Sequence, residues 1–401
     1  MRILMISDVY FPRINGVSTS TQTFRREFEK LGHEVTLIAP DYGDNGAPEH
    51  RTLRIPARRV ILDPEDRMMR GGAVLRLTEQ LRAQQFDIVH IQTPFVAHYA
   101  GVTLARRLGL PRVETYHTLF EEYLYNYIPF LPKSWLRLAA RRFSSWQCND
   151  VDAVIVPSTP MLETLHRYGI QEEGMEVIPT GMELKAFSGG DGARFRERHG
   201  IPPERPTLVH VGRVAFEKNI DFLLRVVYLV KPRLPGILLV IAGEGPALRH
   251  LRRLAADLGL EDNVLFVGYL ARDGELLDCY CAGDAFIFAS RTETQGLVLL
   301  EAMALGVPVV STAVMGTKDI LAPGKGALVA EDDIGDFAKQ VLRVLRDRAL
   351  RERLASEGRA YAATWSATAL AERMVELYRA VVMRSRPTEA ISAVHRAPGR
   401  R

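Results

Sequence analysis

The stretch that decides the fold is residues 289–312, ASRTETQGLVLLEAMALGVPVVST. After Gly296, apolar side chains recur at helical spacing, at Leu297, Leu300, Met303 and Ala304. Gly306 suits the position just past a helix end, and Pro308 cannot continue the helix. A short apolar strand follows at 307–310. The stretch therefore predicts a loop, a helix and a strand in the order typical of α/β proteins.

Two carboxylates, Glu293 and Glu301, flank the start of this predicted helix. We expect Glu293 in the loop and Glu301 about one turn into the helix. The free N–H groups at a helix start attract anions, phosphates above all. Two acids are poorly suited to bind the anion itself but well suited to accept hydrogen bonds from hydroxyls attached to it. The pattern predicts a site for a sugar and a ribose joined by a diphosphate.

Length and composition indicate a soluble protein of two domains. The chain has 401 residues, of which 47% are hydrophobic and 25% charged, enough for two separate cores. No apolar run approaches the roughly 18 residues of a spanning helix. Asp8 interrupts the first apolar run too early for a signal peptide. With only three cysteines, we expect a chain that works in a reducing cytoplasm.

The net charge comes from the C-terminal tail. Residues 384–401 hold five arginines and one glutamate, which account for the whole formal charge of +4. The rest of the chain is balanced, so the sequence does not support binding of nucleic acid by a basic domain. We expect this basic tail to be disordered.

Strand and helix patterns alternate twice along the chain. The predicted strands are 2–7, 34–39, 87–92, 112–117, 152–158, 176–181, 207–212, 236–243, 264–268, 285–290, 308–312 and 327–330. Helices are expected between them, for example at 17–31, 73–84 and 219–231, and residues 44–72 are expected to be rich in loop and basic. The fold class is α/β, with two Rossmann-like doubly wound parallel-sheet domains, at 1–185 and 186–365, joined by a linker within 183–206.

In the first domain, two loops that follow strands carry candidate residues. Asn15-Gly16 follows the first strand, in a loop that lacks the full G-x-G-x-x-G of dinucleotide sites. His117 ends the 112–117 strand, where ligands bind in open α/β sheets. The alternative is a histidine satisfied by a neighbouring backbone group.

The tract 119–149 interleaves aromatic and basic residues. At helical spacing Lys133, Arg137 and Arg141 share one face. Leu136, Ala140, Phe143 and Trp146 share another, and Trp135 and Arg142 lie in the same helix. A basic amphipathic helix with Trp and Phe is typical of membrane-surface helices. The alternative is that the apolar face packs on the domain core and the charges are solvated.

In the second domain, three further loops follow strands. Arg213 and Lys218 offer two cations after Gly212, which suits a diphosphate. Gly243 begins a Gly-Glu-Gly-Pro turn that lets backbone approach a flat ligand. Gly268-Tyr269 lies where a base could meet main-chain groups.

Several enzyme classes lack their signatures here. There is no G-x-S-x-G, H-E-x-x-H or Walker A sequence. Asp150 and Asp152 form an Asp-x-Asp, a pattern that holds a metal in some nucleotide-sugar enzymes. They precede a strand, at a junction where Asp caps or solvates a turn, and we predict no metal site.

Taken together, these residues resemble the retaining glycosyltransferases of family 4, which have the GT-B fold. The resemblance spans about residues 1–383 and is most specific at the Glu293–Glu301 spacing followed by EAMALGVPVV. It implies that Glu293 contacts the transferred sugar, that Glu301 holds the ribose, and that Arg213 and Lys218 contact the diphosphate. It also places His117 by the reacting sugar. The last helix, 366–383, is expected to cross back onto the first domain.

The first half resembles a subgroup that glucosylates diacylglycerol with UDP-glucose. DVYFPRINGVSTS, ETYHTLFEEYLYNYIP, VIVPSTPM and VIPTGMELKAF carry this likeness. Related members act on phosphatidylinositol or cell-envelope acceptors with mannose or another hexose, and a nucleotide-sugar epimerase shares the architecture. One departure from the family pattern is ETQG at 293–296, where many relatives have EGFG.

We therefore expect a hexosyltransferase that moves glucose from UDP-glucose to a lipid with retention at the anomeric carbon. It would need no bound cofactor or metal, and would work at the inner face of the cytoplasmic membrane, held to its anionic surface by Lys133, Trp135, Arg137, Arg141 and Arg142. The expected catalytic residues are His117, Arg213, Lys218 and Glu293. The expected donor-binding residues are Asn15, Gly16, Gly212, Gly243, Gly268, Tyr269, Thr294, Gly296, Leu297 and Glu301.

Overall fold

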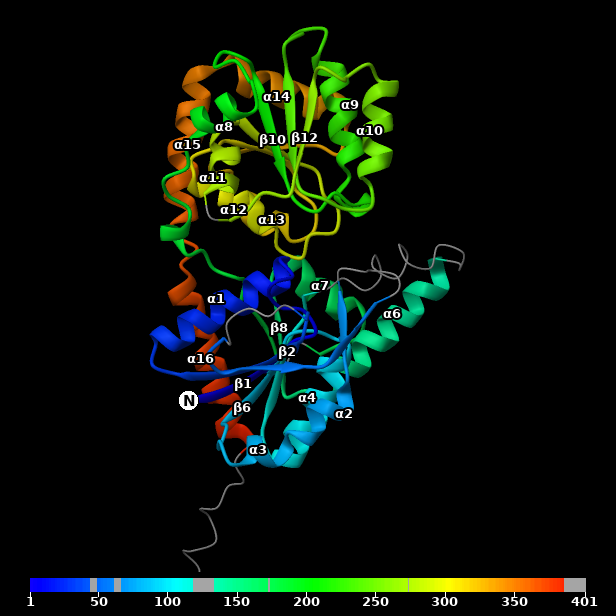
Figure 1. The fold of residues 1–401 in the computed structure, drawn as a ribbon, viewed down its shortest axis with the longest axis vertical. Coiled ribbons are helices and arrows are strands. Elements are labelled where there is room, and N and C mark those ends of the chain that lie inside the picture. The colour runs from blue at the N-terminus through cyan, green and yellow to red at the C-terminus, as the bar shows by residue number, and fades with distance from the viewer. Residues whose placement is uncertain (44–48, 61–65, 118–132, 172–173, 273, 386–401) are drawn as a thin grey trace, which may run out of the picture.

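The structure, a computed structural model, describes residues 1–43, 49–60, 66–117, 133–171, 174–272 and 274–385. Two parallel sheets, each covered by helices on both faces, form two domains stacked along the long axis of the molecule (Figure 1). The predicted α/β architecture is confirmed. Within the described ranges, no helix combines the length and apolarity needed to cross a bilayer.

The first domain contains seven parallel strands in the order β3-β2-β1-β6-β7-β8-β9. Their bounds are β1 (Arg2–Ile6), β2 (Glu34–Pro40), β3 (Thr52–Ile55), β6 (Ile88–Ile91), β7 (Arg112–Thr115), β8 (Ala153–Val156) and β9 (Met175–Val177). A separate antiparallel pair joins β4 (Ala57–Arg59) to β5 (Arg67–Met69). The near-continuous apolar runs reflect strands that are buried on both faces.

Alternate residues of β1 supply the cores on the two faces of this sheet. Ile3 and Met5 join the cluster under α1 (Gly16–Lys30) and α16 (Ala367–Ser385). Leu4 and Ile6 join the cluster on the opposite face. That face is covered by α2 (Gly71–Arg76), α3 (Thr78–Arg82) and α4 (Val96–Leu108), with α6 (Lys133–Cys148) and α7 (Thr159–Arg167) packed beside them.

The second domain has six parallel strands in the order β12-β11-β10-β13-β14-β15. Their bounds are β10 (Thr207–Val211), β11 (Leu238–Ala242), β12 (Val264–Gly268), β13 (Ala285–Phe288), β14 (Val309–Thr312) and β15 (Ala327–Ala330). One face carries α9 (Ile220–Val230), α10 (Leu248–Asp257) and α14 (Ile334–Arg346). The other carries α8 (Gly192–Arg198), α11 (Glu275–Cys281), α12 (Leu297–Ala304) and α13 (Thr317–Leu321), while α15 (Arg348–Ala362) packs against α12 and α14. Short 3-10 turns lie at η1 (Leu184–Ala186) and η2 (Phe216–Lys218).

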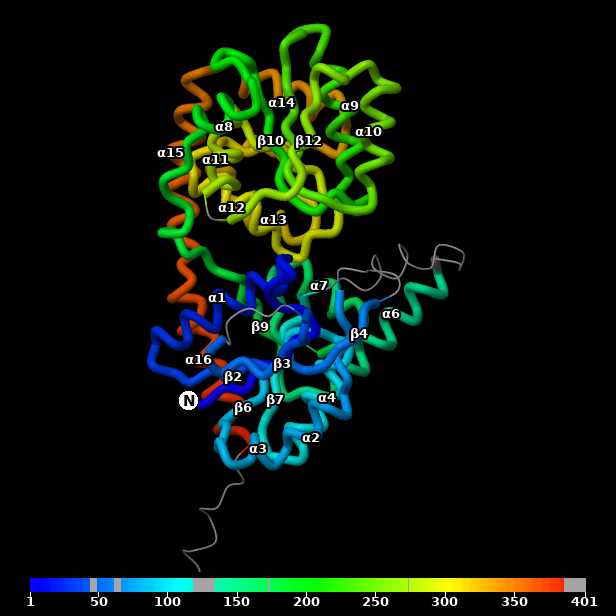
Figure 2. Tube along the Cα trace, in the orientation of Figure 1, coloured from blue at the N-terminus to red at the C-terminus, as the bar shows by residue number. Residues whose placement is uncertain are grey.

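The chain crosses between the domains twice, and the two crossings touch. Met182 donates its N–H to the Trp365 carbonyl at 2.7 Å, and Ala367 donates to the Met182 carbonyl at 3.3 Å. A side chain at Gly181 would lie 2.4 Å from the Cα of Ala367, so a glycine is needed there. After this crossing α16 returns to the first domain and packs on α1, where the Tyr378 hydroxyl bonds His90 (Figures 1 and 2). The expected crossing back is confirmed.

Three local features differ from the expectations or add to them. The described parts of 44–72, a region expected to be rich in loop, also contain β3, β4 and β5, each of them four residues or shorter. The single helix expected at 73–84 is instead α2 and α3, divided at Leu77. The expected linker contains α8. This helix is hard to predict from the sequence because it begins at Gly192, and glycine disfavours a helix. A side chain there would meet the Cys281 carbonyl oxygen at 2.2 Å, so the glycine allows α8 to pack on α11.

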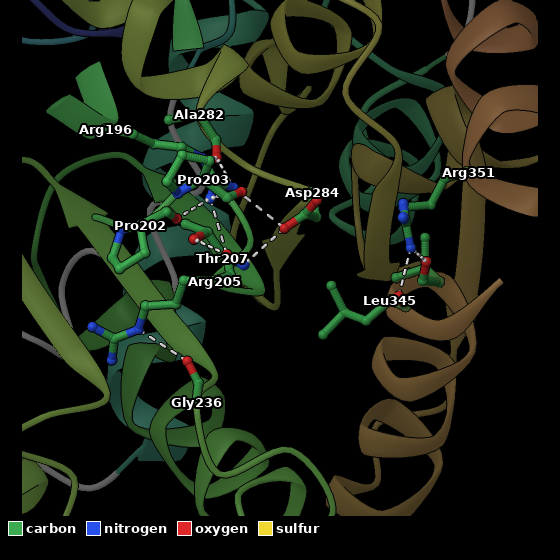
Figure 3. Close-up of polar contacts among 11 residues, drawn as sticks. Arg196, Pro202, Pro203, Arg205, Thr207, Gly236, Ala282, Asp284, Leu345 and Arg351 are labelled. Carbon is green, nitrogen blue, oxygen red and sulfur yellow. Dashed lines mark hydrogen bonds and ion pairs between the residues drawn. The ribbon is translucent and has the colours of Figure 1, made fainter. Parts of the chain in front are cut away.

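Arginine side chains tie the segments around the second sheet together (Figure 3). The Arg196 guanidinium of α8 donates to the carbonyls of Pro202, Pro203 and Ala282 at 2.7–3.1 Å. Arg351 of α15 donates to the Leu345 carbonyl near the end of α14. These bonds satisfy carbonyls in turns and at a helix end, where the regular backbone ladder leaves acceptors free.

Candidate active site

The loop after β13 and the start of α12 form the centre of the candidate site. Gly296 precedes the first helical residue, Leu297, with φ +96, a left-handed conformation that favours glycine. A Cβ there would also lie 2.9 Å from the Thr317 side chain. At the other end, Gly306 (φ +74) and Val307 donate to carbonyls of the last turn, which closes α12 as predicted. The helix axis therefore points its positive end at the 293–296 loop.

Glu293 and Lys218 meet in this loop. The Lys218 ammonium lies 2.5 Å from a Glu293 carboxylate oxygen, and both side chains are largely shielded from solvent. Lys218 ends η2, and Asn219 (φ +56) then turns the chain into α9, its side-chain amide donating to the Ala289 carbonyl. The sequence separation of 75 residues is bridged because β10 and β13 are neighbours in the sheet. A cation and a carboxylate that can accept hydrogen bonds from hydroxyls thus lie together. They are located between β10 and β13, where the strand order changes direction.

His210 lies in β10 beneath this pair. Its Nδ1 contacts the Ile287 carbonyl oxygen at 3.1 Å, and Nε2 has no hydrogen-bond partner among the described residues. The pKa of His210 is lowered to about 4, chiefly by burial and also by the Lys218 charge, against the opposing effects of the Ile287 carbonyl and Glu293. His210 is therefore neutral at physiological pH.

Glu301 is almost completely buried, with 2% of its surface exposed. The Tyr280 hydroxyl donates to one carboxylate oxygen at 2.8 Å, and an Arg272 nitrogen lies 3.4 Å from the other. Burial, then the Glu301 charge, raises the pKa of Tyr280 well above its usual range. A buried carboxylate held by a hydroxyl and a cation is oriented to accept bonds from a ligand on its remaining lone pairs.

The glycines after β10 and β11, Gly212 and Gly243, lie against each other and do not border an open cavity. A side chain at Gly243 would lie 1.9 Å from the Gly212 carbonyl oxygen. Gly243 also donates its N–H to the Gly268 carbonyl at 2.7 Å, so the ends of β10, β11 and β12 are joined. Close packing of backbone on backbone explains Gly243, while Gly212 and Gly268 adopt φ +156 and φ +75. Tyr269, the next residue, is exposed.

Arg213 begins the loop after β10. Its guanidinium lies 3.9 Å from the Glu217 carboxylate, and Glu217 immediately precedes Lys218. Val214 donates to the Glu244 carbonyl at 2.8 Å, which fixes this loop to the one after β11. Arg213 and Lys218 therefore belong to one short, braced segment.

In the first domain, His117 lies two residues after the end of β7 and is paired with Gln92. Its Nε2 lies 3.2 Å from the Gln92 side-chain oxygen, so the N–H is on Nε2 in this pairing. Loss of hydration lowers the pKa of His117 to about 4. The partner of His117 is a side chain, not the backbone group considered as its alternative.

Asn15 and Gly16 open α1. The Asn15 side chain accepts the Ser18 N–H at 2.9 Å, and the Ser18 hydroxyl accepts the Asn15 N–H at 2.9 Å, which is a capping box. A Cβ on Gly16 would meet nothing within 4 Å. The Asn15 side chain thus caps α1, while Gly16 leaves backbone accessible at the helix start.

Hydrogen bonds join the two domains at the carboxyl ends of their strands. Ser158, after β8, donates its hydroxyl to the Thr294 carbonyl at 2.6 Å. Thr159 donates its N–H to the Asp319 carboxylate of α13 at 2.6 Å. Thr180, after β9, pairs with Gln295 through two bonds of 2.8 Å. The 293–296 loop therefore faces the carboxyl ends of the first-domain strands. His117 and the start of α1 lie on the same side of that sheet.

Helix α6 has one buried and one exposed side. Ala140 packs with Tyr116 and Val154, and Leu136 is also buried, so the inner face belongs to the domain core. Trp146 was expected on that face, which is wrong: it is 52% exposed, because helical geometry places it about 80° from Leu136. Exposed side chains instead form an outward stripe. It comprises Trp135, Leu138, Arg142 and Trp146.

The exposed stripe of α6 continues onto neighbouring elements. Trp146 packs against Tyr99 of α4, with ring centroids 5.6 Å apart. Arg141 lies over the Tyr168 ring at 5.6 Å, and Arg137 is exposed. An open depression of about 380 Å³ lies here. Its lining is Leu138, Arg141, Arg142, Ser145, Trp146, Asn149 and Tyr168. Lys133 is the first residue of α6.

The Asp-x-Asp pattern has local partners. Asp150 pairs with Arg106 and lies 3.8 Å from an Arg112 nitrogen. Asp152 accepts the Arg112 N–H at 2.8 Å. Both carboxylates therefore brace the entry to β7 and β8. Among the described residues, no group of three or more His, Cys, Asp or Glu side chains is arranged to hold a metal ion.

The structure also adds residues that the sequence did not indicate. Gln92, Arg272, Tyr280 and Gln295 contact His117, Glu301 or the first domain, and Asp8 lies buried at the end of β1. Burial raises the pKa of Asp8 to about 7, although its Oδ2 accepts bonds from Thr93 and Ala97. None of these has a local pattern that distinguishes it from an ordinary core or loop residue.

Two family models cover most of the chain. Residues 14–186 match the model described as Glycosyltransferase Family 4, and residues 191–361 match Glycosyl transferases group 1. Alpha-monoglucosyldiacylglycerol synthase of Streptococcus pneumoniae is 36% identical over 78% of this chain and 71% of its own length. The chain belongs to glycosyltransferase family 4. This enzyme is accordingly a hexosyltransferase of the GT-B fold.

Other relatives of this glycosyltransferase carry different names. A GDP-mannose-dependent alpha-mannosyltransferase of Mycobacterium tuberculosis is 28% identical over 84% of this chain and 85% of its own length. Among solved structures, Anabaena Alr3699/HepE in complex with UDP-glucose has a TM-score of 0.75 at 17% identity. It matches 95% of this chain and 100% of that one. This structural likeness shows the shared fold.

Proposed function

We propose that this glycosyltransferase transfers glucose from UDP-glucose to diacylglycerol, with retention at the anomeric carbon. The observation that carries the proposal is the Glu293–Lys218 pair at the start of α12, with Glu301 buried about one turn further on. This arrangement offers an acceptor for sugar hydroxyls, a cation and helix end for the diphosphate, and a carboxylate for the ribose. The likeness to alpha-monoglucosyldiacylglycerol synthase supports glucose and diacylglycerol.

Lys218, Arg213 and the N-terminal end of α12 stabilise the charge that develops on the leaving diphosphate in this mechanism. The bond between the anomeric carbon and the diphosphate oxygen breaks as the bond to the lipid hydroxyl oxygen forms on the same face. The hydroxyl proton passes to the departing phosphate. The cations act where a metal would otherwise be needed, so the mechanism includes no bound cofactor or metal.

The first domain supplies the acceptor side. His117 lies at the carboxyl end of β7, and its neutral imidazole can contact the transferred sugar without repelling Lys218. We infer that the exposed stripe of α6, with Arg137, Arg141 and the terminal residue Lys133, holds the enzyme at an anionic membrane. The exposure of Trp135 and Trp146 supports this, since aromatic rings favour the membrane interface. The enzyme then works as a peripheral protein on the inner face of the cytoplasmic membrane.

A donor and acceptor panel tests the proposal. UDP-glucose, GDP-mannose and UDP-galactose are each incubated with the enzyme and vesicles that contain diacylglycerol or phosphatidylinositol. Mass analysis identifies the product, and the anomeric proton coupling gives its stereochemistry. We expect alpha-glucosyldiacylglycerol from UDP-glucose. A mannosylated lipid from GDP-mannose would support instead the second candidate, which the mannosyltransferase relative favours. Conversion of the donor without acceptor would indicate an epimerase.

A further inference from the structure

Gln295 lies between the two carboxylates of the candidate site, but its side chain is turned toward the other domain. It is 6% exposed. Its amide oxygen accepts the Thr180 N–H at 2.8 Å, and its amide nitrogen donates to the Thr180 carbonyl at 2.8 Å. One side-chain amide thus pairs with both polar groups of one backbone residue, as a neighbouring strand would. The two bonds fix both the place and the orientation of the amide.

Thr180 is bound to the crossing between the domains. It precedes Gly181, whose Cα packs against Ala367, and Met182, which bonds the returning chain. The Thr180 hydroxyl also lies 2.7 Å from the Ser20 hydroxyl of α1. Thr180 therefore moves with the first domain, and it is only two residues from the point where the chain leaves that domain.

The rest of the 293–296 loop is held from both sides. The Ser158 hydroxyl of the first domain donates to the Thr294 carbonyl. On the second-domain side, Gly316 donates its N–H to the Glu293 carbonyl at 2.8 Å. A Cβ at Gly316 would lie 2.1 Å from the Thr294 oxygen, so the loop is packed against α13 with no free space. The place of Glu293 thus depends on contacts to both domains.

We propose that Gln295 is a positioning residue that couples the Glu293 loop to the crossing between the domains. When the domains take the arrangement seen here, the paired amide holds the loop, and Glu293 is placed against Lys218. A rotation about the crossing would separate Thr180 from Gln295 and leave buried donors and acceptors without partners, which is unfavourable. The inference rests on the proposed function for the role of Glu293 at the transferred sugar.

Two substitutions at Gln295 test the coupling. Gln295→Met keeps the size of the side chain and removes both hydrogen bonds. We expect kcat to fall about tenfold to a hundredfold while the donor KM changes by less than about threefold, because Lys218 and Glu301 are unaltered. Gln295→Glu can accept the Thr180 N–H at any pH but can donate to the Thr180 carbonyl only when protonated. Burial raises the pKa of a carboxyl group, so the kcat of this variant relative to wild type should rise as the pH is lowered from about 8 to about 6.

Asn263 provides a matched control. It is a buried amide in the same domain, and its side-chain nitrogen donates to the Pro235 and Ile237 carbonyls at 3.0 and 2.7 Å. Asn263→Leu removes a comparable pair of side-chain-to-backbone bonds away from the domain boundary. We expect lower thermal stability with kcat unchanged and no dependence of relative kcat on pH.

Hydrogen–deuterium exchange gives a readout that does not depend on the reaction. In the wild type the Thr180 amide should exchange slowly, and in Gln295→Met a peptide covering 178–183 should exchange faster while peptides around Asn263 do not change. If wild type forms no glucosyl lipid, the proposed function fails, whereas the exchange result still decides whether the domains are joined through Gln295. Unchanged Thr180 exchange, or faster exchange with unchanged kcat for whichever hexose transfer the panel identifies, would overturn the coupling. Should Gln295→Met not fold, Gln295→Glu compared with itself across pH carries the test.

Discussion

Segment 293–301 and helix α6 meet their surroundings in opposite ways. In the segment, polar side chains are paired inside the protein: Glu293 with Lys218, Gln295 with Thr180, and Glu301 with Tyr280. On α6, large apolar side chains face outward, with Trp135 73% and Trp146 52% exposed. Figure 1 shows α12 on the side of the second domain that faces the first, and α6 along the outer flank of the first domain.

The difference separates two kinds of function. The partners of the segment belong to the chain, so its geometry is fixed before any substrate arrives, as charge stabilisation requires. On α6, Trp135 and Trp146 stay more than half exposed although Trp146 packs on Tyr99, and an exposed apolar patch of this kind is typical of an interaction surface. The two regions should therefore be separable by mutation.

The largest effect is expected for Lys218→Met. Removing the cation withdraws charge stabilisation from the leaving diphosphate and leaves Glu293 without its partner. We expect kcat to fall about 10²–10³-fold, as when one preorganised donor is lost from an active site, with binding to vesicles unchanged. Lys339→Met, at an exposed position of α14, is the control and should keep wild-type turnover. A normal kcat for Lys218→Met would remove its catalytic role.

The second prediction changes the surface of α6 and leaves the candidate site intact. In this variant, Arg137, Arg141 and Arg142 are replaced by Glu. Each basic residue near an anionic membrane contributes about 1 kcal/mol, so the loss of three should weaken vesicle binding at least about a hundredfold. Sedimentation with phosphatidylglycerol vesicles measures this. Arg249, Arg252 and Arg253 of α10 replaced by Glu give the same change of charge on an exposed helix of the second domain. Equal losses in both triple variants would show that α6 has no special part in membrane binding.

Glu301→Gln tests the buried end of segment 293–301. The substitution keeps the shape but removes the charge that Tyr280 and Arg272 contact. Loss of charged hydrogen bonds should weaken nucleotide-sugar binding about tenfold to a hundredfold. Titration calorimetry with UDP-glucose measures the change, and Glu352→Gln, from an exposed ion pair with Arg348, is the control. An affinity equal to that of wild type would contradict the ribose role.

The buried histidines predict a pH dependence of stability. Burial lowers the pKa of His117 and His210 to about 4 and of His90 to about 3. Because the unfolded chain binds protons near pH 6.5, the contribution of these histidines to the unfolding free energy should be constant above that value and fall as the pH drops toward about 4, an effect that the raised pKa of Asp8 partly opposes. Denaturant unfolding at several pH values checks this, and His90→Gln should reduce the slope. Stability that is constant down to about pH 4 would show that these histidines are not held neutral.

The smallest effect is expected from metal removal. Lys218 and Arg213 supply positive charge at the diphosphate in the proposed mechanism, so treatment with a chelator should change the transfer rate by less than about twofold. Dialysis against EDTA, followed by assay with and without added Mg²⁺ or Mn²⁺, measures this. A rate that collapses and returns with the cation would show that the protein charges do not suffice.

The sequence allowed the loop and helix of segment 293–301 to be predicted because the residues that determine them act locally. Gly296, the helical spacing of Leu297 and Leu300, and Gly306 each act through the backbone nearest to them, and the structure places α12 accordingly. The ends of β10 and β13 also follow from apolar runs, so Lys218 and Glu293 could each be assigned to a loop after a strand, whereas the pairing of β10 with β13 was not predicted.

Contacts made across the fold could not be predicted in this way. The partner of Gln295 is 115 residues away in the sequence, and nothing near Thr180 marks it as that partner. Trp146 was assigned to the wrong face because helical spacing does not show where the buried sector of a helix ends. Helix α8 was missed because Gly192 disfavours a helix locally, while its packing on Cys281 favours one.

The central claim is that segment 293–301 and the exposed stripe of α6 have separable functions. Its most direct test uses the α6 variant with Arg137, Arg141 and Arg142 changed to Glu. Its affinity for UDP-glucose is measured by calorimetry, and its transfer of glucose is measured with diacylglycerol in anionic vesicles and with a short-chain diacylglycerol in solution. The account predicts wild-type donor affinity and wild-type transfer in solution, with transfer to vesicles reduced by at least about tenfold. A parallel loss of donor affinity, or equal loss with both acceptors, would contradict it.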